Sequence, residues 1–297
     1  MKTATIAIIG SGCVGSTLAY TLLQQKHSSI VLVDKDTACC AAQVADLQDA
    51  ATHSYQAIVQ GTFQQAGQAD IAVIVAGERQ KPGQGREALF AANETIVRNI
   101  IAQMQPLKPT INIIVITNPV DAMTAVALEA SKLPTQQVIG TGTLVDTLRI
   151  RHAIGVELTI AGDAVDLITI GAHNDNQVVL WNQGSIAGKP MQDFPQLTTM
   201  KQQQLIYHAS RKAYEIINGK GFTSFGIAKA ASIIINAILN DSKMVLPVST
   251  YQERYDCCCS MPTVVGNKGA ERILPLQLTA EQEQTFLASL ATLHQSE

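Results

Sequence analysis

The glycine motif at Gly10 to Gly15, reading Gly-Ser-Gly-Cys-Val-Gly, constrains the fold of this chain more than any other stretch. An apolar run from Thr3 to Ile9 precedes it, and a helical pattern from Val14 to Gln25 follows it. A second apolar run, Ile30 to Asp34, ends in an acid. A G-x-G-x-x-G match in this strand, turn, helix and strand order indicates dinucleotide binding, and a glycine turn in an unrelated α/β protein is the alternative.

Each position of this motif has a physical reason. Gly10 makes the tight turn, Gly12 lets the backbone approach a pyrophosphate, and Gly15 lets helix and strand pack closely. The N-terminus of the following helix attracts the phosphates. Asp34 is placed to accept hydrogen bonds from both ribose hydroxyls and to repel a 2′-phosphate, so the sequence predicts NAD rather than NADP.

Further apolar runs alternate with helical patterns, as a parallel sheet covered on both faces requires. The sequence therefore predicts an α/β fold with a Rossmann-type doubly wound parallel sheet in an NAD-binding domain of residues 1–140. The later strands are predicted at Ile71 to Ala76, Ile113 to Thr117 and, as the last one, Val138 to Gly140; the helices are predicted at Glu87 to Gln105 and Val120 to Lys132.

The alternation breaks down from residue 141, which predicts a second, α+β substrate-binding domain over residues 141–297. Helices are expected at Thr143 to Ile154 with Gly155 as the stop, at Gln196 to Asn218, at Ser224 to Asn240, and after a capping box of Thr279 and Gln282 with an apolar stripe of Phe286, Leu287, Leu290 and Leu293. Strands are expected at Val165 to Gly171, around Val178 to Trp181, at Met244 to Val248 and at Cys257 to Val264.

Composition narrows the class of ligand. The chain has 297 residues, 46% of them hydrophobic, and a net charge of −3, which disfavours a nucleic-acid or membrane-surface partner and favours a small molecule. No run is long enough for a membrane span, and the N-terminal stretch is too short for a signal sequence. The six cysteines lack metal-ligand spacing, so we expect reduced thiols in a cytoplasmic protein without a metal site, with Cys257 to Cys259 in a buried strand.

An acid, an arginine and a histidine lie close together in the stretch from Thr141 to Asp175. Asp146 and Arg149 share one face of a predicted helix, and His173 ends the strand that follows. Asp146 is expected to accept a hydrogen bond from the imidazole and to raise its pKa, which suits proton transfer, while Arg149 has the planar donors that grip a carboxylate. An exposed helix salt bridge is the alternative for this acid and arginine. Together these groups predict a hydroxy-acid substrate.

Polar side chains are also expected at the carboxyl edge of the sheet, where doubly wound sheets bind ligands. Arg86 ends a polar, glycine-rich loop that begins at Gly77, and Asn118-Pro119 follows the next strand. A solvated arginine and an ordinary Asn-Pro turn are the alternatives. Thr223, after the Gly-Lys-Gly-Phe stretch that separates two helices, is expected to enter the active site.

Over nearly its full length the chain resembles the L-lactate and malate dehydrogenase superfamily. The resemblance rests on the glycine motif, Asp34, His173 and four further stretches: Ala76 to Arg86, Thr117 to Asp121, Gly140 to Arg149 and Gly221 to Ser224. It implies that His173 is the proton donor and acceptor with Asp146 as its partner, that Arg149 binds the substrate carboxylate, and that Arg86 closes over the substrate and polarises its carbonyl. Asn118 would contact substrate and nicotinamide, and Thr223 would form a wall of the pocket.

The residues expected to bind the cofactor are Gly10, Gly12, Cys13, Val14, Gly15, Asp34, Ala76, Gly77, Thr117, Asn118 and Thr141.

Substrate choice is predicted from Gln80, which falls where malate dehydrogenases carry an arginine. Glutamine suits pyruvate and L-lactate, which implies an NAD-dependent L-lactate dehydrogenase of glycolysis and fermentation. Relatives that act on bulkier 2-oxo acids, such as L-2-hydroxyisocaproate dehydrogenase, share Asp46 to Ala50 and Gly221 to Gly226, so that alternative stays open; malate dehydrogenase is less expected. A non-catalytic dinucleotide-binding regulator is the alternative from another class.

The resemblance also implies a homo-oligomer, a dimer or a tetramer. Two departures from the family pattern are evident: Ala172 and Asn174 replace the usual neighbours of the histidine, and Asp166 stands where effector-activated relatives carry a histidine that binds fructose 1,6-bisphosphate. A carboxylate there repels the effector, so we expect weak or no binding and an Arg151–Asp166 pair across a subunit interface.

Overall fold

The first half of the chain builds the parallel part of the sheet. The computed structural model describes residues 4–25, 28–51, 57–78 and 86–293. Its parallel strands have the order β3-β2-β1-β4-β5-β6, the doubly wound order that the sequence predicts. They are β1 (Ala4–Ile9), β2 (Ser28–Val33), β3 (Ile58–Gln60), β4 (Ile71–Ile74), β5 (Asn112–Val115) and β6 (Val138–Gly140).

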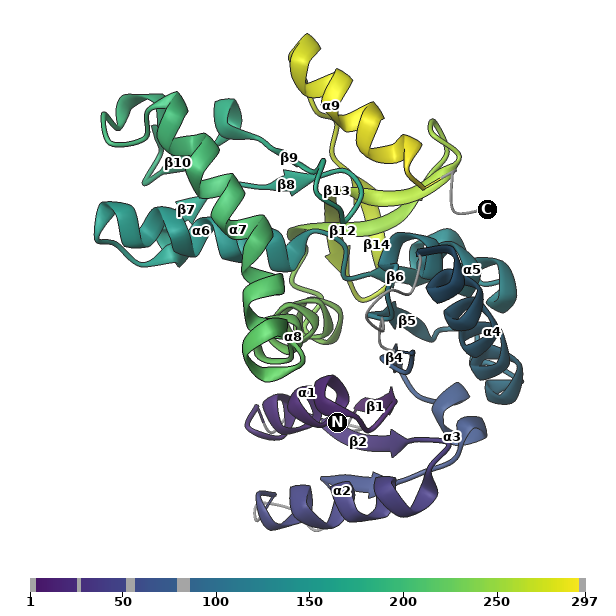
Figure 1. The fold of residues 1–297 in the computed structure, drawn as a ribbon. Coiled ribbons are helices and arrows are strands. Elements are labelled where there is room, and N and C mark those ends of the chain that lie inside the picture. Colours follow the sequence, from purple (N-terminus) through teal and green to yellow (C-terminus); the bar gives the residue numbers. More distant parts are fainter. Residues whose placement is uncertain (1–3, 26–27, 52–56, 79–85, 294–297) are drawn as a thin grey trace.

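Helices connect these strands and cover both faces of the sheet (Figure 1). They are α1 (Cys13–Leu23), α2 (Thr37–Asp49), α3 (Phe63–Gly67), α4 (Arg86–Met104) and α5 (Val120–Ser131). Along β1, Ile6 and Ile8 join one buried cluster, while Ala7 and Ile9 join the cluster on the opposite face. Burial on both faces explains why the strands read as continuous apolar runs.

The second half of the chain continues the same sheet. Antiparallel strands β12 (Met244–Gln252), β13 (Cys257–Gly266) and β14 (Gly269–Ile273) extend it beyond β6, where Ser249 pairs with Gly140, so that nine strands of the described chain form one sheet. The strand at Val138 to Gly140 is therefore the last parallel strand but not an edge. Sequence patterns missed β14 because it has only five residues, two of which, Glu271 and Arg272, are charged.

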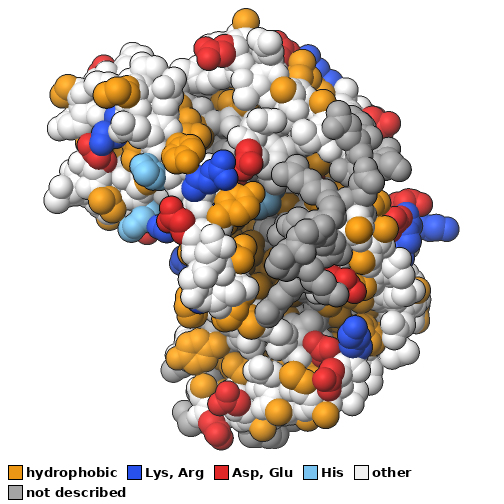
Figure 2. Space-filling model, viewed as in Figure 1, with side chains coloured by type: hydrophobic (Ala, Val, Ile, Leu, Met, Phe, Trp, Pro, Cys, Tyr) orange, Lys and Arg blue, Asp and Glu red, His pale blue; other side chains and the backbone are white. Residues whose placement is uncertain are grey.

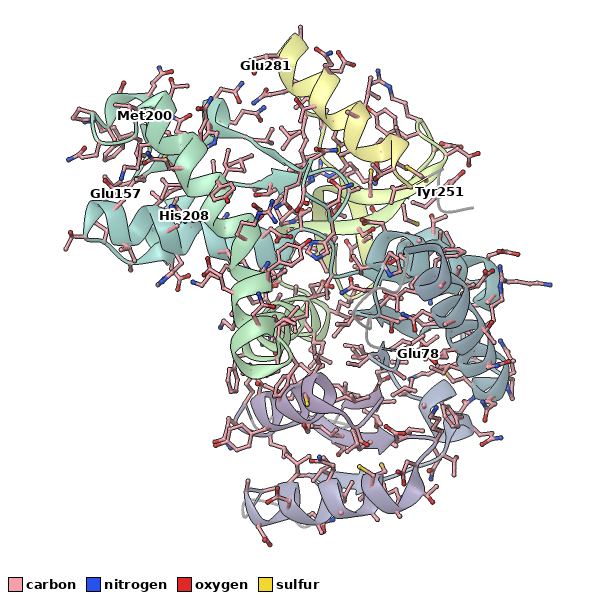
Figure 3. All side chains as sticks on the ribbon, viewed as in Figure 1. Glu78, Glu157, Met200, His208, Tyr251 and Glu281 are labelled. Carbon is pink, nitrogen blue, oxygen red and sulfur yellow. The ribbon has the colours of Figure 1, made fainter. Side chains whose placement is uncertain are left out.

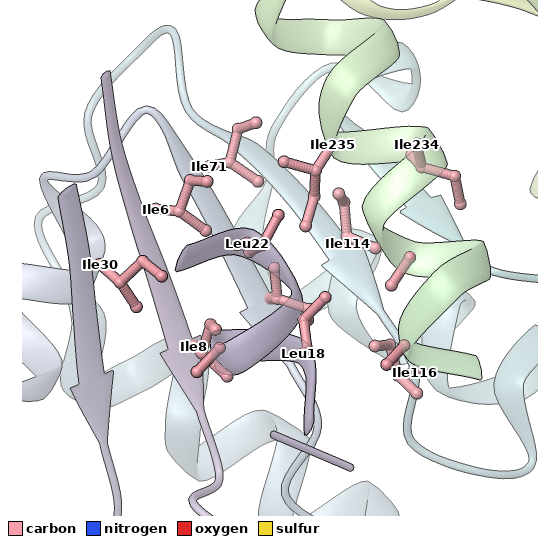
Figure 4. Close-up of a cluster of buried hydrophobic side chains, with 14 of the residues drawn as sticks. Ile6, Ile8, Leu18, Leu22, Ile30, Ile71, Ile114, Ile116, Ile234 and Ile235 are labelled. Carbon is pink, nitrogen blue, oxygen red and sulfur yellow. The ribbon is translucent and has the colours of Figure 1, made fainter. Parts of the chain in front are cut away.

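The remaining elements form two further buried clusters and contribute helical residues to a cluster of the first half. They are α6 (Leu144–Leu158), β7 (Val165–Asp166), β8 (Thr169–Ile170), β9 (Val178–Val179), β10 (Ser185–Ile186), β11 (Lys189–Pro190), α7 (Thr199–Lys220), α8 (Phe225–Leu239) and α9 (Ala280–Ala291). Helix α8 joins the cluster on one face of the parallel strands, where Ile234 and Ile235 lie with Leu18 and Leu22 of α1 (Figure 4). The two halves thus share a core.

Three boundaries of the predicted elements are wrong. Gly155 does not end its helix, because α6 continues to Leu158; the glycine is needed where the chain returns, since a Cβ there would lie 2.7 Å from the Ile160 carbonyl oxygen. The strand expected from Val165 to Gly171 is interrupted and forms β7 and β8. Trp181 lies in a short 3₁₀ helix after β9.

The last helix confirms most of its predicted features. Thr279 and Gln282 form the capping box at the start of α9, and Phe286 and Leu290 are buried. Leu287 was expected on the apolar stripe but is 47% exposed, so that assignment is wrong. The triple cysteine lies in β13 and is buried, as expected.

The described part of the surface carries charges of both signs. On the face in Figure 2, acidic and basic side chains are interspersed, without a continuous basic patch among the residues described there. Within the described ranges, none of the helices combines the length and the apolar character needed to cross a membrane. Those ranges also lack a group of three or more His, Cys, Asp or Glu side chains arranged to hold a metal ion.

Candidate active site

The glycine motif makes the tight turn between β1 and α1. Gly10 has φ +113°, and a Cβ on it would lie 2.7 Å from the Ala76 nitrogen. A Cβ on Gly15 would lie 1.8 Å from the Gly10 carbonyl oxygen. Both positions therefore require glycine, and the strand and helix approach each other as closely as the motif predicts.

Gly12 differs from its two neighbours, because a Cβ on it would meet nothing within 4 Å. It is the N-cap residue of α1 and has no side chain to occupy the helix N-terminus. The helix N-terminus thus opens outward beside a backbone that a ligand can approach. This cradle fits the pyrophosphate of a dinucleotide, which helix N-terminal N–H groups bind.

Asp34 follows β2 and lies beside the same turn. Its carboxylate accepts hydrogen bonds from the Ser11 main-chain nitrogen (2.6 Å), from the Ser11 hydroxyl (2.9 Å) and from the Asp36 main-chain nitrogen (3.0 Å). Partial burial acts to raise the pKa of this carboxyl, but the hydrogen bonds outweigh it and hold the pKa below the usual value. Asp34 therefore carries the negative charge that disfavours a 2′-phosphate.

The carboxyl ends of β4, β5 and β6 bring together the remaining residues predicted to bind the cofactor. Thr117 donates from its hydroxyl to the Ala76 carbonyl oxygen (2.8 Å), and a Cβ on Gly77 would lie 2.6 Å from the Thr117 methyl. The Thr141 main-chain nitrogen bonds to the Val115 carbonyl oxygen (3.0 Å). The edge is thus assembled from three successive strands.

Asn93 of α4 ties two of these strand ends together. It is 1% exposed; its Oδ1 accepts the Glu78 main-chain N–H (2.7 Å), and its Nδ2 donates to the Asn118 carbonyl oxygen (2.7 Å). Glu78 is labelled in Figure 3. Sequence reasoning missed Asn93, because an asparagine inside a helical pattern shows no sign of facing two loops. The predicted contacts of Gln80 and of the Arg86 side chain lie outside the described residues.

A buried acid, an arginine and a histidine meet where the sequence predicts. The Asp146 carboxylate lies 2.6 Å from His173 Nδ1 through Oδ2 and 3.0 Å from Arg149 Nη1 through Oδ1. The Asp146 side chain is 6% exposed and that of Arg149 is 15% exposed. The alternative of an exposed helix salt bridge is therefore wrong.

Hydrogen bonds from α6 explain this meeting. The Thr143 hydroxyl donates to the Thr169 carbonyl oxygen (2.6 Å), and the Thr169 main-chain nitrogen donates to the Thr147 hydroxyl (3.0 Å). Thr143 and Thr147 are one helical turn apart, so they fasten β8 along α6. These bonds hold Asp146 on α6 beside His173, which follows β8.

The charges set the protonation states of the pair. The Asp146 carboxylate outweighs the effect of burial and raises the pKa of His173 from 6.5 to about 8. Burial acts to raise the pKa of Asp146, but the charges and hydrogen bonds of His173 and Arg149 keep it below the usual value. At neutral pH the pair is an imidazolium beside a carboxylate, which is an arrangement suited to donating a proton.

Asp121, which sequence reasoning quoted within a motif but gave no role, lies behind His173. Its Oδ2 accepts the main-chain N–H of His173 (2.7 Å), and its Oδ1 accepts the Ser249 hydroxyl (2.6 Å). It is 3% exposed. The signal for it was weak, because an acid in the first turn of a helix is most often explained by the helix dipole.

The altered neighbours of His173 are bound to α9. The Ala172 main-chain nitrogen donates to the Ser289 hydroxyl (3.2 Å), and the Asn174 amide donates to the Ser289 carbonyl oxygen (3.1 Å) and to the Thr292 hydroxyl (2.9 Å). Asn174 thus has a structural use, because its amide anchors the segment that carries the imidazole; the Ala172 bond uses the main chain and does not depend on its side chain.

Two further predicted residues are placed by the structure. Thr223 is half-buried between α7 and α8. It precedes the Ser224 cap of a helix that contacts α6. Arg151 donates from Nη2 to Asp166 (3.5 Å) and from Nε to the Leu167 carbonyl oxygen (2.8 Å) of its own chain. The pair expected across a subunit interface therefore forms within one chain, because Arg151 lies in the middle of α6 and β7, which carries Asp166, packs against that helix.

Comparison with known proteins agrees with this geometry. Residues 4–140 match the family model described as the NAD binding domain of lactate/malate dehydrogenase, and residues 143–296 match that of its alpha/beta C-terminal domain. The chain belongs to the lactate/malate dehydrogenase family. The resemblance inferred from the motifs and the predicted fold class are both confirmed. NAD is the cofactor of this enzyme.

Individual members of the family are similar over almost the whole chain. L-lactate dehydrogenase A of Rhizopus oryzae is 39% identical over 289 residues, which cover 97% of this chain and 90% of that protein. L-lactate dehydrogenase 2 of Enterococcus faecalis is 36% identical over 301 residues, covering 98% and 95%. The crystal structure of the minor L-lactate dehydrogenase from Enterococcus mundtii in the ligands-bound form matches with a TM-score of 0.95 at 30% identity, covering 100% of this chain and 98% of that one.

Proposed function

We propose that this protein is an NAD-dependent L-lactate dehydrogenase that interconverts pyruvate and L-lactate. The observation that carries the proposal is the His173 imidazole, 2.6 Å from a buried carboxylate that also binds Arg149. The similarity to L-lactate dehydrogenases over 97% or more of the chain supports the choice of substrate.

In this reaction NADH, when bound at the glycine motif and Asp34, would supply the hydride for C2 of pyruvate. His173, protonated because Asp146 raises its pKa to about 8, donates the matching proton to the carbonyl oxygen. In the reverse direction the neutral imidazole accepts the proton of the L-lactate hydroxyl. Asp146 stabilises the charged imidazole and keeps the proton of Nδ1 in place, which leaves Nε2 for the substrate.

The other site residues receive their roles from the family resemblance. Arg149 binds the substrate carboxylate through its remaining donors, since Nη1 is engaged by Asp146. Arg86 polarises the carbonyl, Asn118 orients substrate and nicotinamide, and Thr223 forms a wall of the pocket. The cofactor is held by Gly10, Gly12, Cys13, Val14, Gly15, Asp34, Ala76, Gly77, Thr117, Asn118 and Thr141.

The wider assignment is also part of the proposal. Residues 1–140 form the NAD-binding domain and residues 141–297 the catalytic domain, a division supported by the family-model boundaries at 140 and 143. The enzyme works in the cytoplasm, in glycolysis and fermentation, as a homodimer or homotetramer. Its substrate is a small 2-oxo or 2-hydroxy acid, and it binds neither nucleic acid nor a membrane.

A steady-state panel of 2-oxo acids with NADH tests the proposal. We expect the highest kcat/KM with pyruvate, lower values with 2-oxoisocaproate, and the lowest with oxaloacetate. A preference for 2-oxoisocaproate would instead assign the enzyme to bulkier 2-hydroxy acids. No turnover with any of them would support a non-catalytic regulator that binds NAD.

The variant His173→Gln tests the proposed proton carrier. General acid–base groups contribute roughly 10²- to 10⁴-fold, so we expect kcat to fall by that factor while the affinity for NADH stays the same. His208→Gln, at an exposed position on α7 (Figure 3), is the matched control and should retain wild-type turnover. Wild-type turnover in His173→Gln would assign the proton to another group.

A further inference from the structure

A second carboxylate, Asp121, lies against His173 on a different element from Asp146. Asp121 belongs to the first turn of α5, whereas Asp146 belongs to α6. Asp146 contacts the imidazole ring, and Asp121 contacts the main chain of the same residue through the 2.7 Å hydrogen bond to its N–H. His173 is therefore held by two acids at two different points.

Both oxygens of Asp121 are used. Oδ2 accepts the His173 N–H, and Oδ1 accepts the hydroxyl of Ser249 on β12 (2.6 Å). The carboxylate thus links three parts of the chain: helix α5, strand β12, and the segment that follows β8. These three parts meet where the two halves of the sheet join. If the carboxylate only interacted with the dipole of α5, an exposed position would stabilise the helix equally well and would avoid the free-energy cost of burying a charge.

The charges around the imidazole belong to both helices. Asp146 and Arg149 face it from α6, and Asp121 faces it from α5. On β13, Cys257, Cys258 and Cys259 lie within electrostatic range of Asp121 as buried thiols. The residues of α9 that contact this segment, Ser289 and Thr292, do not titrate.

We propose that Asp121 is a positioning residue for proton transfer, which aligns His173 with Asp146 through its main chain and adds negative charge that favours the imidazolium. The inference rests on the proposed function, because it assumes that His173 carries the proton. The direction of the electrostatic effect agrees, since Asp121 contributes to the raised pKa of His173 after the larger contribution of Asp146. Burial raises the pKa of Asp121 itself, while the hydrogen bonds from Ser249 and the His173 N–H and the charge of the imidazolium act to lower it and favour the carboxylate.

Asp121→Asn separates charge from shape. The amide oxygen can still accept the His173 N–H, and the amide nitrogen can donate to the Ser249 hydroxyl, so the hydrogen-bond geometry is kept while the charge is lost. We expect the alkaline limb of the pH profile of kcat/KM for pyruvate to move down by about 0.5 to 1 pH unit. NADH affinity should stay within about twofold, since Asp121 does not line the glycine motif.

Asp163→Asn is the control for net charge. Asp163 is exposed on the connection between α6 and β7, so this variant removes one negative charge from the same half of the chain without touching His173. Its pH profile should superimpose on that of the wild type. A profile of Asp121→Asn that superimposed on the wild type as well would overturn the proposal.

Ser249→Ala tests positioning by a second route. It leaves the charge of Asp121 but removes the hydroxyl that orients the carboxylate, so we expect kcat to fall severalfold with the KM for pyruvate unchanged. If Asp121→Asn fails to fold, as judged by its melting curve, a wild-type kcat in Ser249→Ala overturns the proposal.

A readout without turnover separates this inference from the proposed function. Titration of the imidazoles by NMR, with His173 assigned by its loss in His173→Gln, measures the pKa of His173 directly. An unshifted pKa in Asp121→Asn refutes the role of Asp121 even if pyruvate is reduced. A shifted pKa in a protein that reduces no 2-oxo acid supports the electrostatic effect and refutes the proposed function.

Discussion

Replacing Asp146 with asparagine removes the largest single effect on the pKa of His173. The isosteric amide keeps the volume of a side chain that is 6% exposed, so the packing of α6 is preserved. It loses the charge that faces both His173 Nδ1 and Arg149 Nη1. Burial of the imidazole lowers its pKa, and in this variant the main effect that raises the pKa is missing.

The magnitude follows from the pKa values. With the pKa of His173 at about 8, about three quarters of the imidazole is protonated at pH 7.5. Without Asp146 the pKa returns to 6.5 or below, and at most about a tenth is protonated at the same pH. Pyruvate reduction should therefore fall at least about eightfold at pH 7.5 from this cause alone, and further because Nδ1 no longer has a fixed proton acceptor.

The assay is the pH dependence of kcat/KM for pyruvate at saturating NADH. In the wild type the reaction needs the imidazolium, so activity should be full below pH 6.5 and should be lost as pH rises through about 8. In Asp146→Asn this limb should lie at pH 6.5 or below, and lactate oxidation should gain at neutral pH relative to reduction. Glu157→Gln, which removes a charge from α6 at a position paired with Lys201, is the control. A limb that stayed near pH 8 in Asp146→Asn would refute the reasoning.

Three further predictions concern cofactor, substrate and effector. Asp34→Ser should raise kcat/KM for NADPH relative to NADH by about tenfold or more, because the carboxylate no longer faces the 2′-phosphate. Gln80→Arg should raise the ratio of oxaloacetate to pyruvate kcat/KM, because an arginine pairs with the second carboxylate. Fructose 1,6-bisphosphate should leave hyperbolic pyruvate saturation curves unchanged, because Arg151 is already engaged by Asp166 and Leu167 of its own chain.

Each of these predictions has an outcome that contradicts it. An unchanged ratio of NADPH to NADH kcat/KM in Asp34→Ser would remove Asp34 as the discriminating group. An unaltered substrate ratio in Gln80→Arg would place substrate charge selection elsewhere. Sigmoidal saturation that becomes hyperbolic with millimolar effector would show that Asp166 does not prevent binding.

The first half of the fold was predictable where glycine geometry and apolar runs coincide. A side chain at Gly10 or Gly15 would collide with neighbouring backbone atoms, and β1, β4 and β5 are buried on both faces. Sequence analysis left the stretch from residue 37 to 70 without elements, because α2 consists mostly of small and polar residues and α3 is short. Their burial is decided by the sheet rather than by their own patterns.

The candidate site was predictable in part. Asp146 and His173 are 27 positions apart, and their contact could be inferred because each ends or starts a recognisable element. Asp121 and Ser249 are 128 positions apart and meet only because β12 joins the sheet beside β6. No local sequence pattern predicts that β12 pairs with β6. The contact of Asp121 with His173 could therefore not be inferred before the strand order was known.

The position of α8 has a consequence for biosynthesis. During translation the parallel strands β1, β4 and β5 and helix α1 are made long before residues 225–239, which complete the cluster that contains Leu18, Ile114 and Ile234 (Figure 4). A nascent chain that ends near residue 140 would leave part of one apolar face of its sheet exposed to solvent, because α1 packs on that face but α8 is missing. Stable folding should therefore begin only after α8 has left the ribosome, and a fragment truncated at the family-model boundary should depend on chaperones or aggregate.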